Sequence, residues 1–249
     1  MNEKKRWNSI APTYNEEIFD VYQSDKNKVL PRYLKKHGNK AHTVLDFGCG
    51  NGKSFSFLSP LFKNILAIDI SQGLIGEAKR RPYSNVEFKT LDLSRHGLHL
   101  PQVDFVFCCN VIMLPEVEKN YHMFRNIHHA LKPGGTAVII IPSMESGLFS
   151  LWRMIDLYRK EGTKLNDIPS DDLDYMSLKR KDIMQGILAI DKVPTKHYTA
   201  PEIEVIIQGE GLRLTSLEKV EYKWDSEFSE PPEWMKEPYP WDWLVECKK

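Results

Sequence analysis

The stretch TVLDFGCGNGKSF, residues 43–55, decides the fold class of this 249-residue chain. An apolar, β-branched run comes first and ends with an acid, Asp46, after which glycines occupy alternate positions, namely Gly48, Gly50 and Gly52. An apolar strand that leads into a glycine turn is typical of a parallel α/β sheet that binds its ligand at the strand end. The stretch also contains Gly-Lys-Ser, the ending of a triphosphate-binding loop, so two kinds of ligand have to be compared.

The triphosphate alternative does not fit the spacing of the glycines. Such a loop has the pattern G-x-x-x-x-G-K-[ST], and counting back from Gly52 places its first glycine at the position of Phe47. Asp46 would also lie beside the phosphates and repel them. The glycines instead let the backbone turn tightly and approach a ligand closely. The acid suits a cationic ligand, such as S-adenosylmethionine (SAM), which carries an ammonium and a sulfonium.

Short apolar runs alternate with helix-like segments up to residue 143. The runs are HTVLDF (42–47), NILAID (64–69), VEFKTLD (86–92), VDFVFCCN (103–110) and TAVIIIPS (136–143). Strands that are apolar throughout and separated by helices indicate a parallel sheet covered on both faces, which is a doubly wound α/β fold. Near the end of the chain a capped helix at TAPEIE, a strand, and a final strand at WDWLVECKK resume the pattern.

Residues 144–199 interrupt this alternation, because they contain helix-like pieces and an acidic loop but no visible strand period. We therefore interpret residues 1–249 as a single domain, in which 144–199 is a mainly helical insertion over the carboxyl edge of the sheet. We expect this insertion to act as a lid and to bind substrate. Large aromatic residues either line a substrate pocket or form a core seam between lid and sheet. They are Trp152, Tyr158, Tyr175, Trp224, Trp234, Trp241 and Trp243.

Two more acids end neighbouring strands. Asp69 ends the second strand, about twenty residues after the glycine turn, where a carboxylate can accept both hydroxyls of a ribose. Asp92 ends the third strand, where it either meets an adenine amino group or forms a plain turn. Because the carboxyl ends of parallel strands meet at one edge of a sheet, we expect Asp46, Asp69 and Asp92 to converge there.

Five motifs, in this order and spacing, resemble those of the class I SAM-dependent methyltransferases, in particular the broad "type 11" group. They are VLDFGCGNG, LAIDIS, LDLS, DFVFCCNVIMLPE and LKPGGTAVIIIPS. The likeness covers about residues 7–143 and 198–217, and it includes the lead-in WNSIAPTYN. It implies a Rossmann-like sheet of seven strands in the order 3-2-1-4-5-7-6, with the last strand antiparallel. It also implies SAM as cofactor and S-adenosylhomocysteine (SAH) as product.

The resemblance further implies which residues bind the cofactor. These residues are Tyr14, Asp46, Gly48, Cys49, Gly50, Asp69, Ile70, Asp92, Leu93 and Asn110. The first five would hold the methionine part, the next two the ribose, and the following two the adenine edge, while Asn110 would lie between cofactor and acceptor. No catalytic residue is identified, although His197, just before the TAPEIE helix, is a candidate for contact with substrate or an ordinary loop histidine.

The composition of the chain argues against several classes of binding partner. Lysine plus arginine equals aspartate plus glutamate at 34 each, which argues against the basic excess of a nucleic-acid binder. The cysteines lack C-x-x-C spacing and the histidines lack the spacing of a zinc motif, so we expect no metal. No long apolar run or signal-like N-terminus is visible, so we expect a cytoplasmic protein without membrane association, as a monomer or homodimer.

The leading hypothesis is methyl transfer to a small-molecule acceptor by in-line displacement at the sulfonium methyl. In that reaction the protein contributes alignment and exclusion of water, and a general base matters mainly for a hydroxyl acceptor. Two alternatives remain open. The string GCGNGK also occurs in methyltransferases that modify wobble uridines of tRNA, and a fold by itself does not exclude a SAM-binding protein without catalysis.

Overall fold

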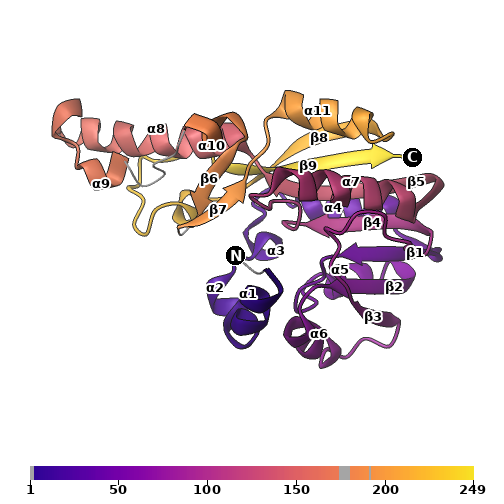
Figure 1. The fold of residues 1–249 in the computed structure, drawn as a ribbon. Helices are drawn as coiled ribbons and strands as arrows, with labels where there is room; N and C mark the ends of the chain where they lie inside the picture. Colours follow the sequence, from indigo (N-terminus) through magenta and orange to yellow (C-terminus); the bar gives the residue numbers. More distant parts are fainter. Residues whose placement is uncertain (1–2, 174–179, 191) are drawn as a thin grey trace.

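The centre of the computed structural model, which describes residues 3–173, 180–190 and 192–249, is a seven-stranded sheet (Figure 1). Its strands, in spatial order, are β3 (Val86–Thr90), β2 (Phe62–Asp69), β1 (Asn39–Phe47), β4 (Val103–Cys109), β5 (Leu131–Pro142), β9 (Trp241–Lys248) and β8 (Arg213–Glu221). Strands β3 to β5 run parallel, and β9 is antiparallel to both β5 and β8. This confirms the predicted Rossmann-like order and the antiparallel last strand.

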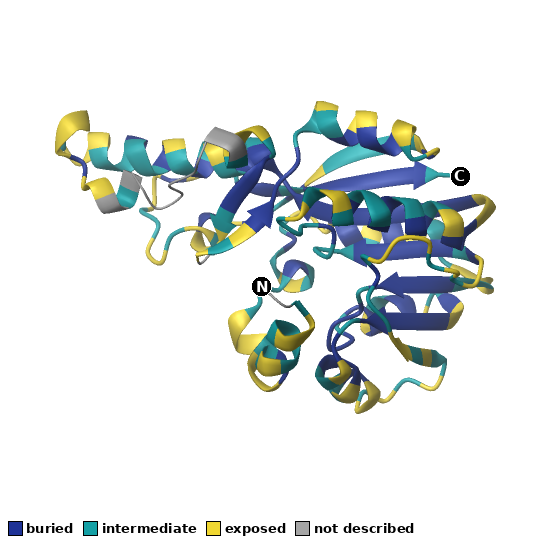
Figure 2. Ribbon diagram, viewed as in Figure 1, coloured by how far each residue is buried: buried dark blue, intermediate teal, exposed yellow. Residues whose placement is uncertain are grey.

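Helices cover both faces of the sheet, which is why the parallel strands read as continuous apolar runs. The helices on one face are α4 (Val29–His37), α5 (Phe55–Leu58) and α6 (Gln72–Lys79), and those on the other are α7 (Val117–Ala130) and α11 (Ala200–Gly209). Successive β1 residues alternate between the two cores, since Val44 packs with the first set and Leu45 with the second. Figure 2 shows the resulting buried centre of the sheet.

Side-chain caps fix where two of these helices begin. The Ser71 hydroxyl accepts a hydrogen bond from the Leu74 amide at 3.1 Å, as expected for the start of α6. At the start of α11, Thr199 and Glu202 form a reciprocal capping box. The α6 cap places the end of β2 and the following turn at the carboxyl edge of the sheet.

The N-terminal residues lie across this edge. They form α1 (Glu3–Ile10), a 3₁₀ turn η1 (Ala11–Thr13), α2 (Tyr14–Glu17) and α3 (Val21–Ser24). Asn8 attaches α1 to the start of α6, because its Oδ1 accepts hydrogen bonds from the Ser71 hydroxyl at 2.8 Å and the Gly73 amide at 2.9 Å. In the part of the chain that the structure describes, no helix is both long and apolar enough to cross a bilayer.

The segment between β5 and α11 is mainly helical, as predicted, but it also contains a β-hairpin that was not predicted. It contains α8 (Met144–Lys160), the 3₁₀ turn η2 (Leu165–Asp167), α9 (Ser170–Leu173), α10 (Arg180–Met184), and a hairpin of β6 (Ile187–Ile190) and β7 (Val193–Lys196). No strand was predicted there, and the hairpin corrects this, since strands of four residues are too short for a period of two to show. A last 3₁₀ turn, η3 (Trp224–Ser226), lies between β8 and β9.

The two ends of this segment meet. Ser143 and Tyr198 form a parallel bridge, and the Tyr198 amide donates a hydrogen bond to the Pro142 carbonyl at 2.9 Å. In Figure 1, α8 and α9 project beyond the sheet, while the β6–β7 hairpin lies beside its carboxyl edge. The Lys196 amide also donates to the Met113 carbonyl at 3.0 Å, which connects β7 to the loop after β4. Of the residues discussed above, Tyr175 lies outside the described part of the chain.

Candidate functional site

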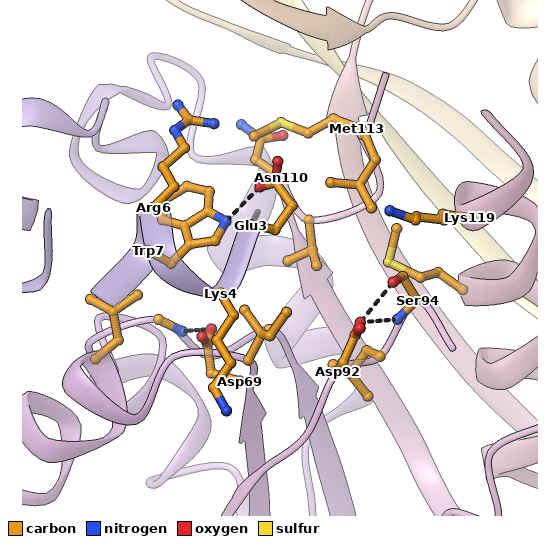
Figure 3. A pocket seen from close by; sticks show the side chains of 18 of the residues that line it. Glu3, Lys4, Arg6, Trp7, Asp69, Asp92, Ser94, Asn110, Met113 and Lys119 are labelled. Atoms are coloured by element: carbon orange, nitrogen blue, oxygen red, sulfur yellow. Dashed lines mark hydrogen bonds between the residues drawn. The ribbon is translucent and has the colours of Figure 1, made fainter. Parts of the chain in front are cut away.

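A cavity of about 730 Å³ lies at the carboxyl edge of the sheet (Figure 3), within the range of about 300–1,000 Å³ that small-molecule sites occupy. Its wall comes from the turn after β1, the ends of β2, β3 and β4, helix α1 and strand β7. Most of the residues implied for cofactor binding line it, namely Tyr14, Gly48, Gly50, Asp69, Ile70, Asp92, Leu93 and Asn110. Asp46, Cys49 and His197 do not.

The turn after β1 presents bare backbone to this cavity. Gly48 and Gly50 have φ of 83° and 52°, which side chains rarely tolerate. A Cβ on Gly48 would lie 2.3 Å from Val111 Cγ2, and one on Gly50 would lie 2.9 Å from the Tyr14 hydroxyl. The turn is also fixed to β2, because the Gly48 amide donates a hydrogen bond to the Ile68 carbonyl at 2.8 Å. A ligand can therefore approach the main chain closely here.

Asp69 connects two turns. Its Oδ2 accepts a hydrogen bond from the Gly50 amide at 2.9 Å, and its Oδ1 accepts one from the Ser71 amide at 2.8 Å. Burial raises the pKa of this carboxyl, while the backbone hydrogen bonds act in the opposite direction. Each carboxylate oxygen can accept a second hydrogen bond, so Asp69 can still receive a donor from the cavity. That it binds a ribose stays a prediction.

Asp46 precedes the turn and Cys49 lies within it, and both residues are buried. The Ser54 hydroxyl donates a hydrogen bond to Asp46 Oδ2, and burial raises the pKa of Asp46 to about 7. Lys53 forms an ion pair with Asp20 at 2.9 Å. The Lys-Ser pair that resembled a phosphate loop thus has partners within the protein, while contact of Asp46 and Cys49 with a methionine part stays a prediction.

Asp92 forms a turn and also lines the cavity, while its contact with an adenine stays a prediction. Its Oδ1 accepts hydrogen bonds from the Ser94 amide at 3.0 Å and the Ser94 hydroxyl at 2.6 Å, so the residue does form a local turn. The same residue lines the cavity, as Figure 3 shows. Because the turn uses only Oδ1, Oδ2 is available to a ligand.

Asn110 has the least usual environment in the site. It follows β4 with a φ of 51°, in the left-handed region, and its Nδ2 donates a hydrogen bond to Asp242 Oδ2 at 3.0 Å. The Tyr222 hydroxyl donates to the same oxygen at 2.8 Å. Asn110 Oδ1 is buried and has no hydrogen-bond partner among the described residues. Sequence analysis did not find Asp242 and Tyr222, which lie far from Asn110 along the chain and in no motif.

Tyr14 and α1 close the side of the cavity that faces the turn. Burial and the Asp69 charge raise the pKa of Tyr14 well above its usual value, so its hydroxyl stays a neutral hydrogen-bond donor. From α1, the Trp7 indole N–H donates to Glu3 at 3.1 Å, and the Arg6 guanidinium lies 5.1 Å from the centre of the Trp7 ring. The lead-in motif includes both Trp7 and Tyr14, whereas no pattern indicated Glu3 and Arg6.

His197 lies one layer behind the cavity. It is buried, its Nδ1 lies 3.0 Å from the Thr195 carbonyl, and burial lowers its pKa to about 4, so the ring is neutral near pH 7. Thr195 itself lines the cavity. Contact of His197 with a substrate stays a prediction, and the geometry gives it no direct path to the cavity.

The described members of the aromatic set named above, from Trp152 to Trp243, do not line the cavity. Trp224, Trp241 and Trp243 are buried, whereas 52% of Trp152 and 38% of Trp234 are exposed. Phe149 of α8 contacts both Trp224 and Trp241, with ring centres 5.5 Å and 6.4 Å apart. The described aromatic residues therefore form a seam between α8 and the C-terminal part of the chain.

These features fit SAM in three respects. Bare backbone leaves room for an amino-acid tail, acids follow β2 and β3 where a nucleoside would lie, and a buried amide oxygen at Asn110 has no partner among the described residues. Among curated proteins, the chain is 30% identical to a protein of Invertebrate iridescent virus 6 that carries the name methyltransferase 235L, over 78% of this chain and 70% of the viral protein. The chain belongs to the class I SAM-dependent methyltransferases. SAM is accordingly its cofactor.

A family model agrees with this membership, and solved structures share the fold. The model described as a methyltransferase domain matches residues 44–135 of this methyltransferase. N-methyltransferase NodS from Bradyrhizobium japonicum, solved with SAH, has a similar fold, with a TM-score of 0.61, 13% identity and coverage of 100% of this chain and 99% of NodS. A 1,6-didemethyltoxoflavin-N1-methyltransferase from Burkholderia thailandensis aligns with a TM-score of 0.60, 14% identity and coverage of 98% and 87%.

Proposed function

We propose that this methyltransferase transfers the methyl group of SAM to a small-molecule acceptor. The observation that carries the proposal is the composition of the cavity wall, which includes Met113 after β4 and Val193, Pro194 and Thr195 of β7 as well as the cofactor-side residues. A cavity of this size beside the cofactor suits a small acceptor. The toxoflavin precursor methyltransferase, which was solved with its small substrate, offers a parallel for this size of acceptor.

In this proposal each side chain of the cofactor side has a defined contact. Asp69 and Ile70 bind the ribose, Asp92 and Leu93 meet the adenine edge, and Tyr14 closes over the methionine end as a neutral donor. Asp46 and Cys49, with Gly48 and Gly50, hold the methionine part. When bound, SAM supplies the activated methyl group, and the chain contributes alignment of the two reactants and exclusion of water.

We further propose that residues 144–199 form a lid on the single domain. The support is that the segment leaves and returns at one point, the Ser143–Tyr198 bridge, and that its β7 strand reaches the cavity. Limited proteolysis with and without SAH tests this. SAH should slow cleavage within 144–199, and equal cleavage rates in both states would contradict a lid.

A second candidate is methylation of tRNA, which basic side chains at the cavity favour. They are Lys4, Arg6, Arg95 and Lys119, and such residues can bind phosphates. Purified protein is incubated with methyl-labelled SAM and either a small-molecule extract or bulk tRNA. Label in the small-molecule fraction supports the proposal, while salt-sensitive labelling of tRNA supports the second candidate. SAH binding without transfer to either would support a non-catalytic SAM-binding protein.

A further inference from the structure

We propose that Asp242, on the last strand, is a positioning residue that turns the oxygen of the Asn110 carboxamide away from itself, so that this oxygen, buried beside the cavity, accepts a hydrogen bond from the ammonium of SAM. The inference rests on the proposed use of the cavity as the cofactor site. It adds to the site a residue that lies 132 positions away from Asn110 in the sequence.

The orientation of the amide follows from hydrogen-bond chemistry. An ionised carboxylate only accepts hydrogen bonds, whereas a carboxamide has a donating and an accepting end. Asp242 Oδ2 lies 3.0 Å from the Asn110 side chain, so the NH₂ group must face it. The flipped amide would place two oxygens against each other. The Asn110 oxygen is therefore directed away from Asp242.

Asp242 itself is fixed in place. The Tyr222 hydroxyl donates to the same Oδ2 at 2.8 Å, so this carboxylate oxygen receives one donor from β4 and one from the end of β8. Burial raises the pKa of Asp242, and these two hydrogen bonds act in the opposite direction. These two donors fix the orientation of the buried Asp242 carboxylate. The carboxylate in turn fixes the orientation of the Asn110 amide.

The side-chain oxygen of Asn110 can still accept a hydrogen bond. Asn110 Oδ1 is buried without a hydrogen-bond partner among the described residues, although buried acceptors are nearly always paired. The residue also has a φ of 51°, a conformation that is sparsely populated and that concentrates at functional sites. Both features are consistent with an acceptor that is completed by a ligand.

The residues around Asn110 indicate which part of SAM donates a hydrogen bond to its side-chain oxygen. Val111, the next residue, packs against Gly48, and the turn at Gly48 is where the methionine part is expected. Of the two charged groups on that part, the ammonium donates hydrogen bonds and the carboxylate only accepts them. An amide oxygen backed by a carboxylate therefore suits the ammonium and disfavours the carboxylate.

The test compares SAH with 5′-methylthioadenosine, which keeps the nucleoside and lacks the amino-acid tail. Isothermal titration calorimetry gives Kd for both on each variant, and the ratio of the two cancels general damage to the nucleoside site. In Asn110→Ala, SAH should bind about 10- to 100-fold more weakly, as for a lost hydrogen bond to a charged group, while methylthioadenosine is unaffected. Asp242→Leu should lower the preference for SAH in the same way.

Two further variants separate positioning from packing. Asp242→Asn keeps the shape and an acceptor oxygen, so it should restore most of the preference that Asp242→Leu loses. Tyr222→Phe removes the other donor to Asp242 and leaves the Asn110 hydrogen bond, so its Kd ratio should match the wild type. Equal weakening of both ligands by the Asn110 and Asp242 variants, or no weakening, would overturn the inference alone. A wild-type protein that binds neither ligand would overturn the proposed cofactor site together with it.

Discussion

The cofactor side and the acceptor side of the cavity are built in different ways. On the cofactor side, hydrogen bonds hold the polar groups in place, both between neighbouring turns, as from the amides of Gly50 and Ser71 to Asp69, and across the sheet, as from Asn110 to Asp242. On the side where we propose that the acceptor binds, the wall comes from the loop after β4 and from β7, which lies outside the seven-stranded sheet. A fixed shape suits a cofactor that a family shares, and a wall from a loop and a hairpin suits a change of acceptor.

The largest loss of SAH affinity is expected for a substitution of Gly48, where the cofactor side has no room for a side chain. Gly48→Val should abolish measurable SAH binding, a loss of more than about 100-fold, because the new side chain meets Val111 and needs a φ that valine avoids. Calorimetry with SAH measures this. The matched control is Gly134→Val, since Gly134 has a similar φ of 78° but nothing within 4 Å of an added Cβ. That variant should lose stability, by about 1–3 kcal/mol, but keep SAH affinity.

The second-largest loss of SAH affinity is expected when the charge of Asp69 is removed. Asp69→Asn keeps the shape but lacks a charged acceptor, and it places an NH₂ group near a backbone amide. SAH should bind about 10- to 150-fold more weakly, the equivalent of about 1.5–3 kcal/mol. Asp104→Asn is the control, because Asp104 Oδ2 also accepts from a backbone amide, that of Thr43 at 2.9 Å, yet lies at the start of β4, away from the cavity. Equal affinities for the Asp69 variant and wild type would contradict the ribose assignment.

The same contrast explains how much the sequence could predict. The sheet order was implied by the resemblance to class I methyltransferases, while the cavity positions of Asp69 and Asp92 follow from local patterns, since each acid lies at the end of an apolar run. Asp242 was not predictable, because it meets Asn110 only after β9 inserts beside β5. The hairpin was missed because β6 and β7 have only four residues each.

A third prediction compares buried titratable groups on the two sides. The pKa of Asp46 is raised by burial to about 7, so between about pH 4 and 7 the folded state keeps a proton that the unfolded state has lost. This group therefore makes stability fall as pH rises through that window, by at most about 1.4 kcal/mol per pH unit. Asp46→Asn should remove that fall, as measured by urea unfolding at several pH values.

His197 should act in the opposite direction. Its pKa is lowered by burial to about 4, so between about pH 4 and 6.5 the unfolded state binds the proton that the folded state lacks, and stability rises with pH. His197→Gln should remove this rise. Variants with unchanged pH profiles would show that these groups are less buried in solution than in the structure.

The smallest effect is expected on the outer surface of the acceptor side. Trp152 of α8 is 52% exposed and stacks on Phe149 with ring centres 6.0 Å apart, but neither residue lines the cavity. Trp152→Ala should change the free energy of unfolding by less than about 1 kcal/mol, because it removes a partly exposed contact. Its Kd for SAH should equal that of the wild type, since no hydrogen bond of the cofactor side depends on α8. A tenfold weaker Kd would instead mean that the segment 144–199 and the cofactor side are energetically coupled, and the two sides would then have to be treated as one site.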